Sequence, residues 1–172
     1  SPICSGSTTV SGTSSEANGT VVEVYINGTF TVPASTATVT GGNWTATVPA
    51  LTAGNTVTAY ALASGKCVST VSSGVTVNGA STAAVLANSG ASTIACNSSA
   101  NLKVTITGGT SPFTVVYSDG TSNFTVNSYI SGTDIPVSPS STTNYSLVSV
   151  TSTGGCAGTG LSGTPTVTVT IT

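Results

Sequence analysis

Residues 164–172 read TPTVTVTIT, and after Pro165 hydroxyl and β-branched residues alternate without a break. Side chains on a β-strand point to opposite faces with a period of two, so Val167, Val169 and Ile171 share one face. This pattern predicts a half-buried strand. Similar alternation recurs along the chain, for example in TVVEVYI at residues 20–26. The sequence therefore predicts an all-β protein.

Turn signals separate these runs and repeat along the chain. Asn27-Gly28 is a strong hairpin signal, and Gly-Gly, Asn-Gly and Asp-Gly pairs follow other runs. Seven or so short strands per half, with a turn every ~8–12 residues, predict two tandem immunoglobulin-like β-sandwich domains, each with one disulfide. We place these domains at residues 1–79 and 80–172. Residues 83–86 are predicted as an edge strand of the second domain, and Tyr145 as its tyrosine corner.

Charge is scarce in this chain. It carries two Lys and no Arg, four Asp and Glu together and no His, with a net charge of −2. Nucleic-acid binding and binding to anionic membranes both depend on basic patches, which this sequence lacks. No apolar run approaches the ~20 residues of a membrane-spanning helix, so direct membrane insertion is not expected. Serine and threonine hydroxyls must keep the surface solvated.

Four cysteines, Cys4, Cys67, Cys96 and Cys156, indicate an oxidising compartment. No CxxC pair or Cys/His cluster is present, which argues against zinc. Three pairings are open. The near-equal separations of 63 and 60 positions (67 − 4 and 156 − 96) favour Cys4–Cys67 and Cys96–Cys156. Each such bridge would stabilise its domain by roughly 4 kcal/mol in the chain-entropy model.

The carboxylates do not predict an active site. Glu23 is the polar member of an alternating strand, and Asp119 lies in a Ser-Asp-Gly turn, where Asp accepts hydrogen bonds from its own backbone. Glu16 and Asp134 complete two carboxylate pairs that resemble a glycosidase pair only in composition. We therefore expect no enzyme, no catalytic residue, no metal site and no cofactor.

Two kinds of surface site are predicted. Trp44, the single tryptophan, is a candidate ligand contact for a glycan, with packing against the core as the favoured alternative. Tyr25, Tyr117 and Tyr129 are further aromatic candidates. Six Asn-X-Ser/Thr sequences offer acceptors for N-glycosylation. They are Asn18, Asn27, Asn43, Asn97, Asn123 and Asn144.

Longer motifs carry a family resemblance. PICSGSTTVSGTSSEANGTVVEVYINGT, followed by GNWTATVPALTAGNTVTAYA, resembles the Ig-like repeats of giant secreted Bacteroidetes surface proteins, of the gliding-adhesin type and secreted by the type IX system. TIACNSSANLKVTITGGTSPFTVVYSDG resembles a companion repeat, in which Trp more often stands in place of Phe113. These repeats act mostly as spacers. Because the proteins that contain them are secreted surface proteins, the resemblance implies an extracellular or cell-surface location.

Composition and resemblance together predict a non-enzymatic structural unit of an extracellular fibre, stalk or giant adhesin. Its expected partners are copies of itself or adjacent repeats, joined in tandem or by strand pairing. The alternative is a carbohydrate- or surface-binding module of a secreted protein. Because residues 164–172 run to the end of the sequence as a strand, we also expect Val167, Val169 and Ile171 to form a strand that couples one unit to the next.

Overall fold

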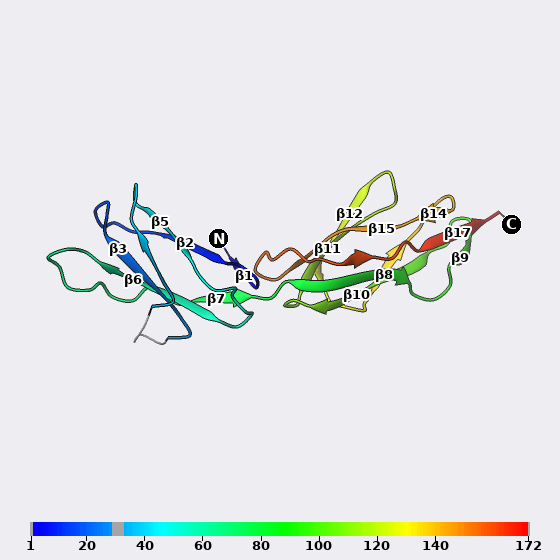
Figure 1. Ribbon diagram of the computed structural model, residues 1–172. Helices are drawn as coiled ribbons and strands as arrows, with labels where there is room; N and C mark the ends of the chain where they lie inside the picture. The colour runs from blue at the N-terminus through cyan, green and yellow to red at the C-terminus, as the bar shows by residue number, and fades with distance from the viewer. Residues whose placement is uncertain (1, 29–32, 172) are drawn as a thin grey trace. The chain divides into compact units, whose positions relative to one another are not determined.

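The computed structural model describes residues 2–28 and 33–171, and these residues form β-strands joined by turns, with no helix among them (Figure 1). The predicted all-β class is confirmed. The chain divides into two units, Ser1–Asn78 and Gly79–Thr172, whereas the sequence prediction placed the boundary after Gly79. Each unit has its own hydrophobic core.

The first unit is built from two sheets. Its strands are β1 (Ile3–Cys4), β2 (Thr9–Thr13), β3 (Val21–Ile26), β4 (Ser35–Thr38), β5 (Asn43–Thr47), β6 (Thr56–Leu62) and β7 (Val75–Asn78). The larger sheet has the order β1-β7-β6-β3-β4, and β2 pairs with β5 in the smaller one. A return strand predicted at residues 29–32 lies outside the described residues.

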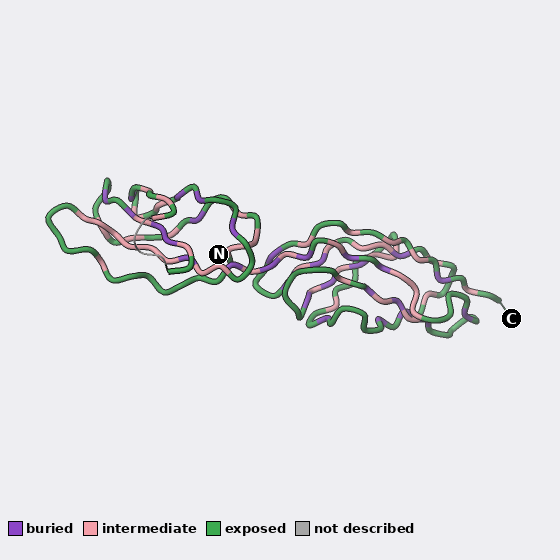
Figure 2. The backbone as a smooth tube through the Cα atoms, turned by 60° about the horizontal axis from the view of Figure 1, so that its bottom comes forward, coloured by how far each residue is buried: buried purple, intermediate pink, exposed green. Residues whose placement is uncertain are grey.

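Alternation places one face of each sheet in the core of the first unit. Val24 and Val57 come from the larger sheet, and Val10 and Ala46 from the smaller one; all four are buried in one cluster. Figure 2 shows buried stretches of the backbone among half-buried and exposed ones in this unit. The two sheets therefore pack face to face. The turn signal after β3 is confirmed, because Asn27 and Gly28 have φ values of 58° and 70°, as a type I′ turn requires. The two-residue hairpin itself stays a prediction, because its return strand lies outside the described residues.

The second unit contains the remaining strands. They are β8 (Ser81–Asn88), β9 (Thr93–Ala95), β10 (Ala100–Gly108), β11 (Phe113–Ser118), β12 (Asn123–Tyr129), β13 (Asp134–Val137), β14 (Thr143–Asn144), β15 (Ser146–Ser152), β16 (Leu161–Ser162) and β17 (Thr166–Thr170). They form three sheets with the orders β13-β10-β8-β16, β12-β11-β15 and β14-β17-β9.

One core joins these three sheets. Leu102 of β10, Val115 of β11 and Val167 of β17 are each fully buried in the same cluster. Phe113 also lies in it and is 5% exposed, so the phenylalanine at this position fills the core. Strand β8, predicted as an edge strand over residues 83–86, instead pairs with β10 on one side and β16 on the other.

The disulfide arrangement corrects the sequence prediction. Cys4 and Cys156 are the disulfide-bonded cysteines, whereas Cys67 and Cys96 are free and exposed. Neither the Cys4–Cys67 bridge nor the Cys96–Cys156 bridge forms. The prediction relied on near-equal spacing along the chain, and that spacing does not measure distance in the fold.

Strand register explains why Cys4 and Cys67 do not meet. Cys4 pairs with Asn78 at the end of β7, and β7 pairs with the start of β6 at Thr56. Cys67 follows the other end of β6, which ends at Leu62. A strand of seven residues is ~20 Å long, whereas bridged Cα atoms lie within about 7 Å. The two cysteines therefore lie at opposite ends of the first unit.

Cys96 and Cys156 are separated in the same way within the second unit. The backbone N–H of Cys96 donates to Thr170 at the end of β17. The start of β17 pairs with Asn144, just before β15, whereas the carbonyl of Cys156 accepts a hydrogen bond from Ser152 at the far end of β15. The length of β15 thus separates the two cysteines.

Candidate functional site

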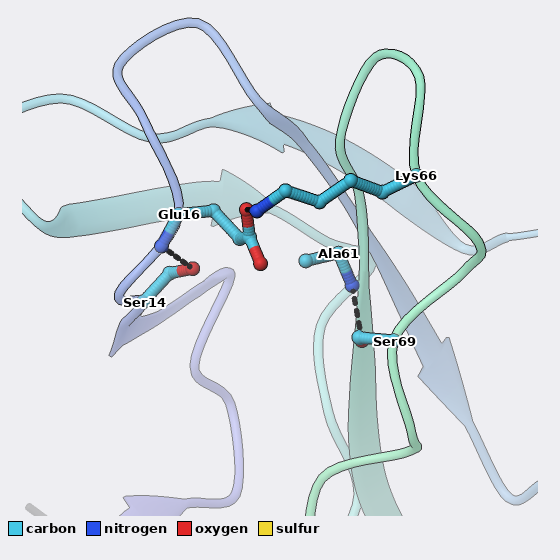
Figure 3. Close-up of polar contacts among 5 residues, drawn as sticks. All are labelled: Ser14, Glu16, Ala61, Lys66 and Ser69. Carbon is cyan, nitrogen blue, oxygen red and sulfur yellow. Dashed lines mark hydrogen bonds and ion pairs between the residues drawn. The ribbon is translucent and has the colours of Figure 1, made fainter.

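Glu16 and Lys66 form an ion pair in the first unit (Figure 3). Glu16 lies in the β2–β3 connection, where its N–H donates to the Oγ of Ser14 at 3.2 Å. The Nζ of Lys66 reaches across from the β6–β7 connection to the Oε2 of Glu16 at 2.7 Å. The lysine side chain is 64% exposed, so this ion pair contributes little to stability. The ion pair links the β2–β3 connection to the β6–β7 connection.

The other three carboxylates also have structural partners. Glu23 accepts a hydrogen bond from the hydroxyl of Tyr25 at 2.7 Å, and this bond is the main cause that raises the pKa of Tyr25. Asp134 accepts from the Nδ2 of Asn101 at 3.3 Å. Asp119 accepts from its own turn, as predicted. Residues 2–28 and 33–171 contain no group of three or more His, Cys, Asp or Glu that could hold a metal ion.

Serine side chains cover the part of the β6 edge that extends beyond its short pairing with β7. The N–H of Ala61 donates to the Oγ of Ser69 at 2.9 Å (Figure 3). The N–H of Ala59 donates to the Oγ of Ser72 at 3.0 Å. The same two serines donate their own N–H groups to the carbonyls of Ala61 and Ala59. The β6–β7 connection thus satisfies this edge without forming a strand.

Trp44 packs on the core, as the favoured alternative predicted, and also lines a shallow cleft. It lies opposite Gly12 in the β2–β5 pair, and a Cβ added to Gly12 would lie 2.5 Å from the indole. The indole therefore covers the glycine and packs partly against the core cluster. Its remaining surface lines a cleft of about 320 Å³ together with Tyr60. A glycan contact at Trp44 stays a prediction.

All six predicted glycosylation acceptors are exposed. They are Asn18, Asn27, Asn43, Asn97, Asn123 and Asn144. Four of them use their side chains in hydrogen bonds: Asn18, Asn27, Asn43 and Asn144. Modification of any of the six stays a prediction.

The predicted coupling strand becomes more exposed toward its end. Val167 is fully buried in the core, Val169 is half-buried, and Ile171 is 95% exposed and follows the end of β17. Both sides of β17 pair within its own unit, with β14 through Val167 and with β9 through Val169. Val167 is thus a core residue, and coupling through Ile171 stays a prediction.

A second cleft lies where the β11–β12 hairpin meets the proline-containing segment after β13. Its volume is about 530 Å³, and Tyr117, Phe124, Pro139 and Tyr145 line it. Tyr117 and Phe124 are cross-strand neighbours whose rings stack at 5.3 Å with an interplanar angle of 22°. The ring of Tyr145 lies 6.1 Å from that of Tyr117, tilted by 57°. Three aromatic rings therefore form one wall.

Asp119 is the charged group of this cleft. Its Oδ1 accepts the N–H of Ser122 at 2.7 Å and the N–H of Thr121 at 2.8 Å. These two bonds favour the ionised form and lower the pKa of Asp119 below its usual value. Burial raises the pKa of Tyr117, and the charge of Asp119 raises it further. Burial likewise raises the pKa of Tyr145, with smaller contributions from Tyr117 and Asp119.

Sequence reasoning did not identify Phe124 and Tyr145 as part of this cleft. Tyr145 was predicted as a tyrosine corner, yet within the described chain its hydroxyl has no hydrogen-bond partner. Tyr129 has the satisfied buried hydroxyl instead: it accepts the N–H of Val104 at 2.8 Å and donates to the carbonyl of Thr133 at 2.6 Å. The signal that could have pointed to Phe124 was an aromatic residue just after a predicted turn on an otherwise polar strand.

Comparisons with known proteins give similarity in structure alone. No family model and no curated protein matches the chain. A solved structure of the BSP domain of a biofilm-associated protein is 20% identical, with a TM-score of 0.39; the match covers 98% of this chain and 28% of that chain. An I-band fragment of titin is 12% identical, with a TM-score of 0.44, and the match covers 100% of this chain and 62% of that chain. The chain thus spans less than two thirds of the length of either structure.

Proposed function

We propose that this chain is a non-enzymatic structural unit of an extracellular fibre, stalk or giant adhesin, made of two immunoglobulin-like sandwiches. The observation that carries the proposal is the tandem of two β units, each with its own core formed between packed sheets. Such a unit separates or connects other parts of a longer assembly. The sequence resemblance to repeats of giant secreted Bacteroidetes surface proteins supports the same role.

The contacts of the four carboxylates support a structural role. Each of the four carboxylates accepts a hydrogen bond or forms an ion pair within its own unit. A surface that depends on hydroxyls for hydration also changes little with ionic strength, because salt screens charges and not hydroxyls.

The cysteines support an extracellular location. A disulfide between cysteines such as Cys4 and Cys156 is compatible with an oxidising compartment and uncommon in a reducing one.

No helix within the described ranges is long and apolar enough to cross a membrane.

Immunogold electron microscopy of the producing cells tests this function, with antibodies raised against the chain. We expect label on fibres or stalks outside the cell. Cells treated with pre-immune serum are the control. Label confined to the cytoplasm, or dispersed in the medium without any fibre or cell surface, would contradict the proposal.

A further inference from the structure

The cleft beside the β11–β12 hairpin contains an exposed aromatic ring that is unusual for a surface strand. Phe124 is 41% exposed, while the neighbouring rings of Tyr117 and Tyr145 are 6% and 4% exposed. The two buried rings support Phe124 from one side through the stacked pair at 5.3 Å. Its position is therefore fixed, and the exposed part of the ring can stack on a ligand.

Two tyrosine hydroxyls accompany this ring. Tyr117 and Tyr145 both line the cleft, and within the described residues neither hydroxyl has a hydrogen-bond partner. Neither oxygen is among the buried side-chain atoms that lack a partner, so both hydroxyls reach solvent. The raised pKa values of Tyr117 and Tyr145 keep both groups protonated at neutral pH, so each can donate. A ligand that enters the cleft meets two donors.

Acceptors and small hydroxyl groups complete the lining. Asp119 is ionised at neutral pH and sits on the rim, and Ser138, Ser140 and Thr143 lie on the opposite segment. No Lys or Arg lines the cleft, since Lys66 lies in the first unit and Lys103 lies on β10. An anionic ligand would therefore meet the Asp119 carboxylate without a compensating cation, which disfavours it.

We infer that the cleft formed by Tyr117, Phe124, Tyr145 and Asp119 binds a neutral saccharide. The C–H groups on the face of a pyranose ring carry partial positive charge and are attracted to the negative face of an aromatic ring. The hydroxyls around its edge can accept from Tyr117 and Tyr145 and donate to Asp119. Mixed apolar and hydrogen-bonding walls of this kind are typical of small-molecule sites. This inference goes beyond the structural role and does not depend on it.

Titration of the ¹⁵N-labelled chain with oligosaccharides, followed by NMR, tests the inference. The probes are neutral gluco-, manno-, galacto- and N-acetylglucosamine oligosaccharides and an oligogalacturonate. We expect at least one neutral probe to shift amide signals of residues 119–124 and 138–145. The oligogalacturonate should bind at least about tenfold more weakly, because Asp119 repels its carboxylates.

Variants assign the site. Phe124→Ala should weaken binding about tenfold, since loss of a stacking face and its buried area amounts to roughly 1.4 kcal/mol. Tyr145→Phe removes one hydroxyl and leaves the ring in the core, so it should weaken binding without lowering the melting temperature. Asp119→Asn keeps the Oδ1 acceptor of the turn and should reduce the discrimination against oligogalacturonate. Ile130→Ala is the control, because Ile130 is 52% exposed and lies outside the cleft.

Several outcomes would overturn the inference. One is that no neutral probe shifts any signal at about 10 mM, a concentration that detects even millimolar affinity. Another is that the shifts cluster around Trp44 and persist in Phe124→Ala, which would place the saccharide in the first unit. Equal binding of neutral and acidic probes would overturn the predicted selection by charge.

Discussion

At the scale of single residues, some hydrogen bonds depend on neighbours in the sequence and others depend on the position of the residue in the fold. Asp119 behaves as its Ser-Asp-Gly context predicts, because its hydrogen bonds come from residues two and three positions along the chain. Tyr145 was predicted as the tyrosine corner, but the tyrosine whose hydroxyl bonds to the backbone of another strand is Tyr129, which bonds to Val104. The hydrogen bonds of a turn come from neighbouring residues, whereas the partner of a tyrosine hydroxyl depends on which strands pack together.

The Asp119 turn gives a pH prediction. The N–H groups of Ser122 and Thr121 lower the pKa of this carboxyl in the folded state. The stabilisation is therefore present above the pKa of the unfolded chain and is lost as the pH falls through the folded pKa. Carboxyl ¹³C NMR should show that the pKa of Asp119 lies below the ordinary aspartate value of 3.8. A folded-state pKa at or above 3.8 would contradict the prediction.

At the scale of elements, the two units treat their free strand edges differently. The β6 edge is covered by Ser69 and Ser72. Strand β12 ends the β12-β11-β15 sheet, and within the described chain its backbone pairs with β11 alone. It has seven residues, NFTVNSY, without charge or proline. Strand edges of this kind, which lack Lys or Pro to block pairing, are open to another strand.

We expect Thr125→Lys to weaken self-association through β12. A charge on the edge strand opposes pairing with an uncharged strand, while Thr125 is exposed and its replacement should change stability by less than about 0.5 kcal/mol. Sedimentation velocity over a concentration series measures the effect, and we expect the wild-type chain to associate as its concentration rises.

Thr105→Lys is the matched control for this measurement. Thr105 is also exposed, but it lies on β10, which has β8 and β13 on its two sides. If the wild-type chain and both variants sediment as monomers throughout, or if the two variants weaken association equally, pairing through β12 is not the mode of assembly.

At the scale of the whole molecule, the cysteines fall into two classes. Cys4 and Cys156 are disulfide-bonded, and Cys67 and Cys96 are free, exposed thiols. A disulfide restricts the unfolded chain and typically stabilises a protein by about 2–4 kcal/mol. Two free thiols on the surface do not contribute in this way.

Thiol labelling tests these classes. A maleimide should modify Cys67 and Cys96 in the native, unreduced chain, and all four cysteines after reduction and unfolding. Peptide mass spectrometry identifies the labelled sites. Reduction should also lower the free energy of unfolding by about 2–4 kcal/mol, both in the wild type and in a Cys67→Ala/Cys96→Ala variant. Label on native Cys4, or protection of Cys67, would show a different pairing.

The sequence by itself determined the strands and many of the turns. Alternation in β3 and β17 depends only on the two-residue period of a strand, and the turn at Asn27-Gly28 depends only on backbone sterics. These interactions act between residues close in the chain, so a single sequence is enough to predict them.

Only the tertiary structure decided which distant residues meet. Equal spacing suggested that Cys4 pairs with Cys67, but the direction of β6 separates them by the length of a strand. Phe124 and Tyr145 are 21 positions apart (145 − 124) and meet in one cleft because both contact Tyr117. Register and strand order set these distances, and they result from the packing of whole sheets, which no local pattern encodes.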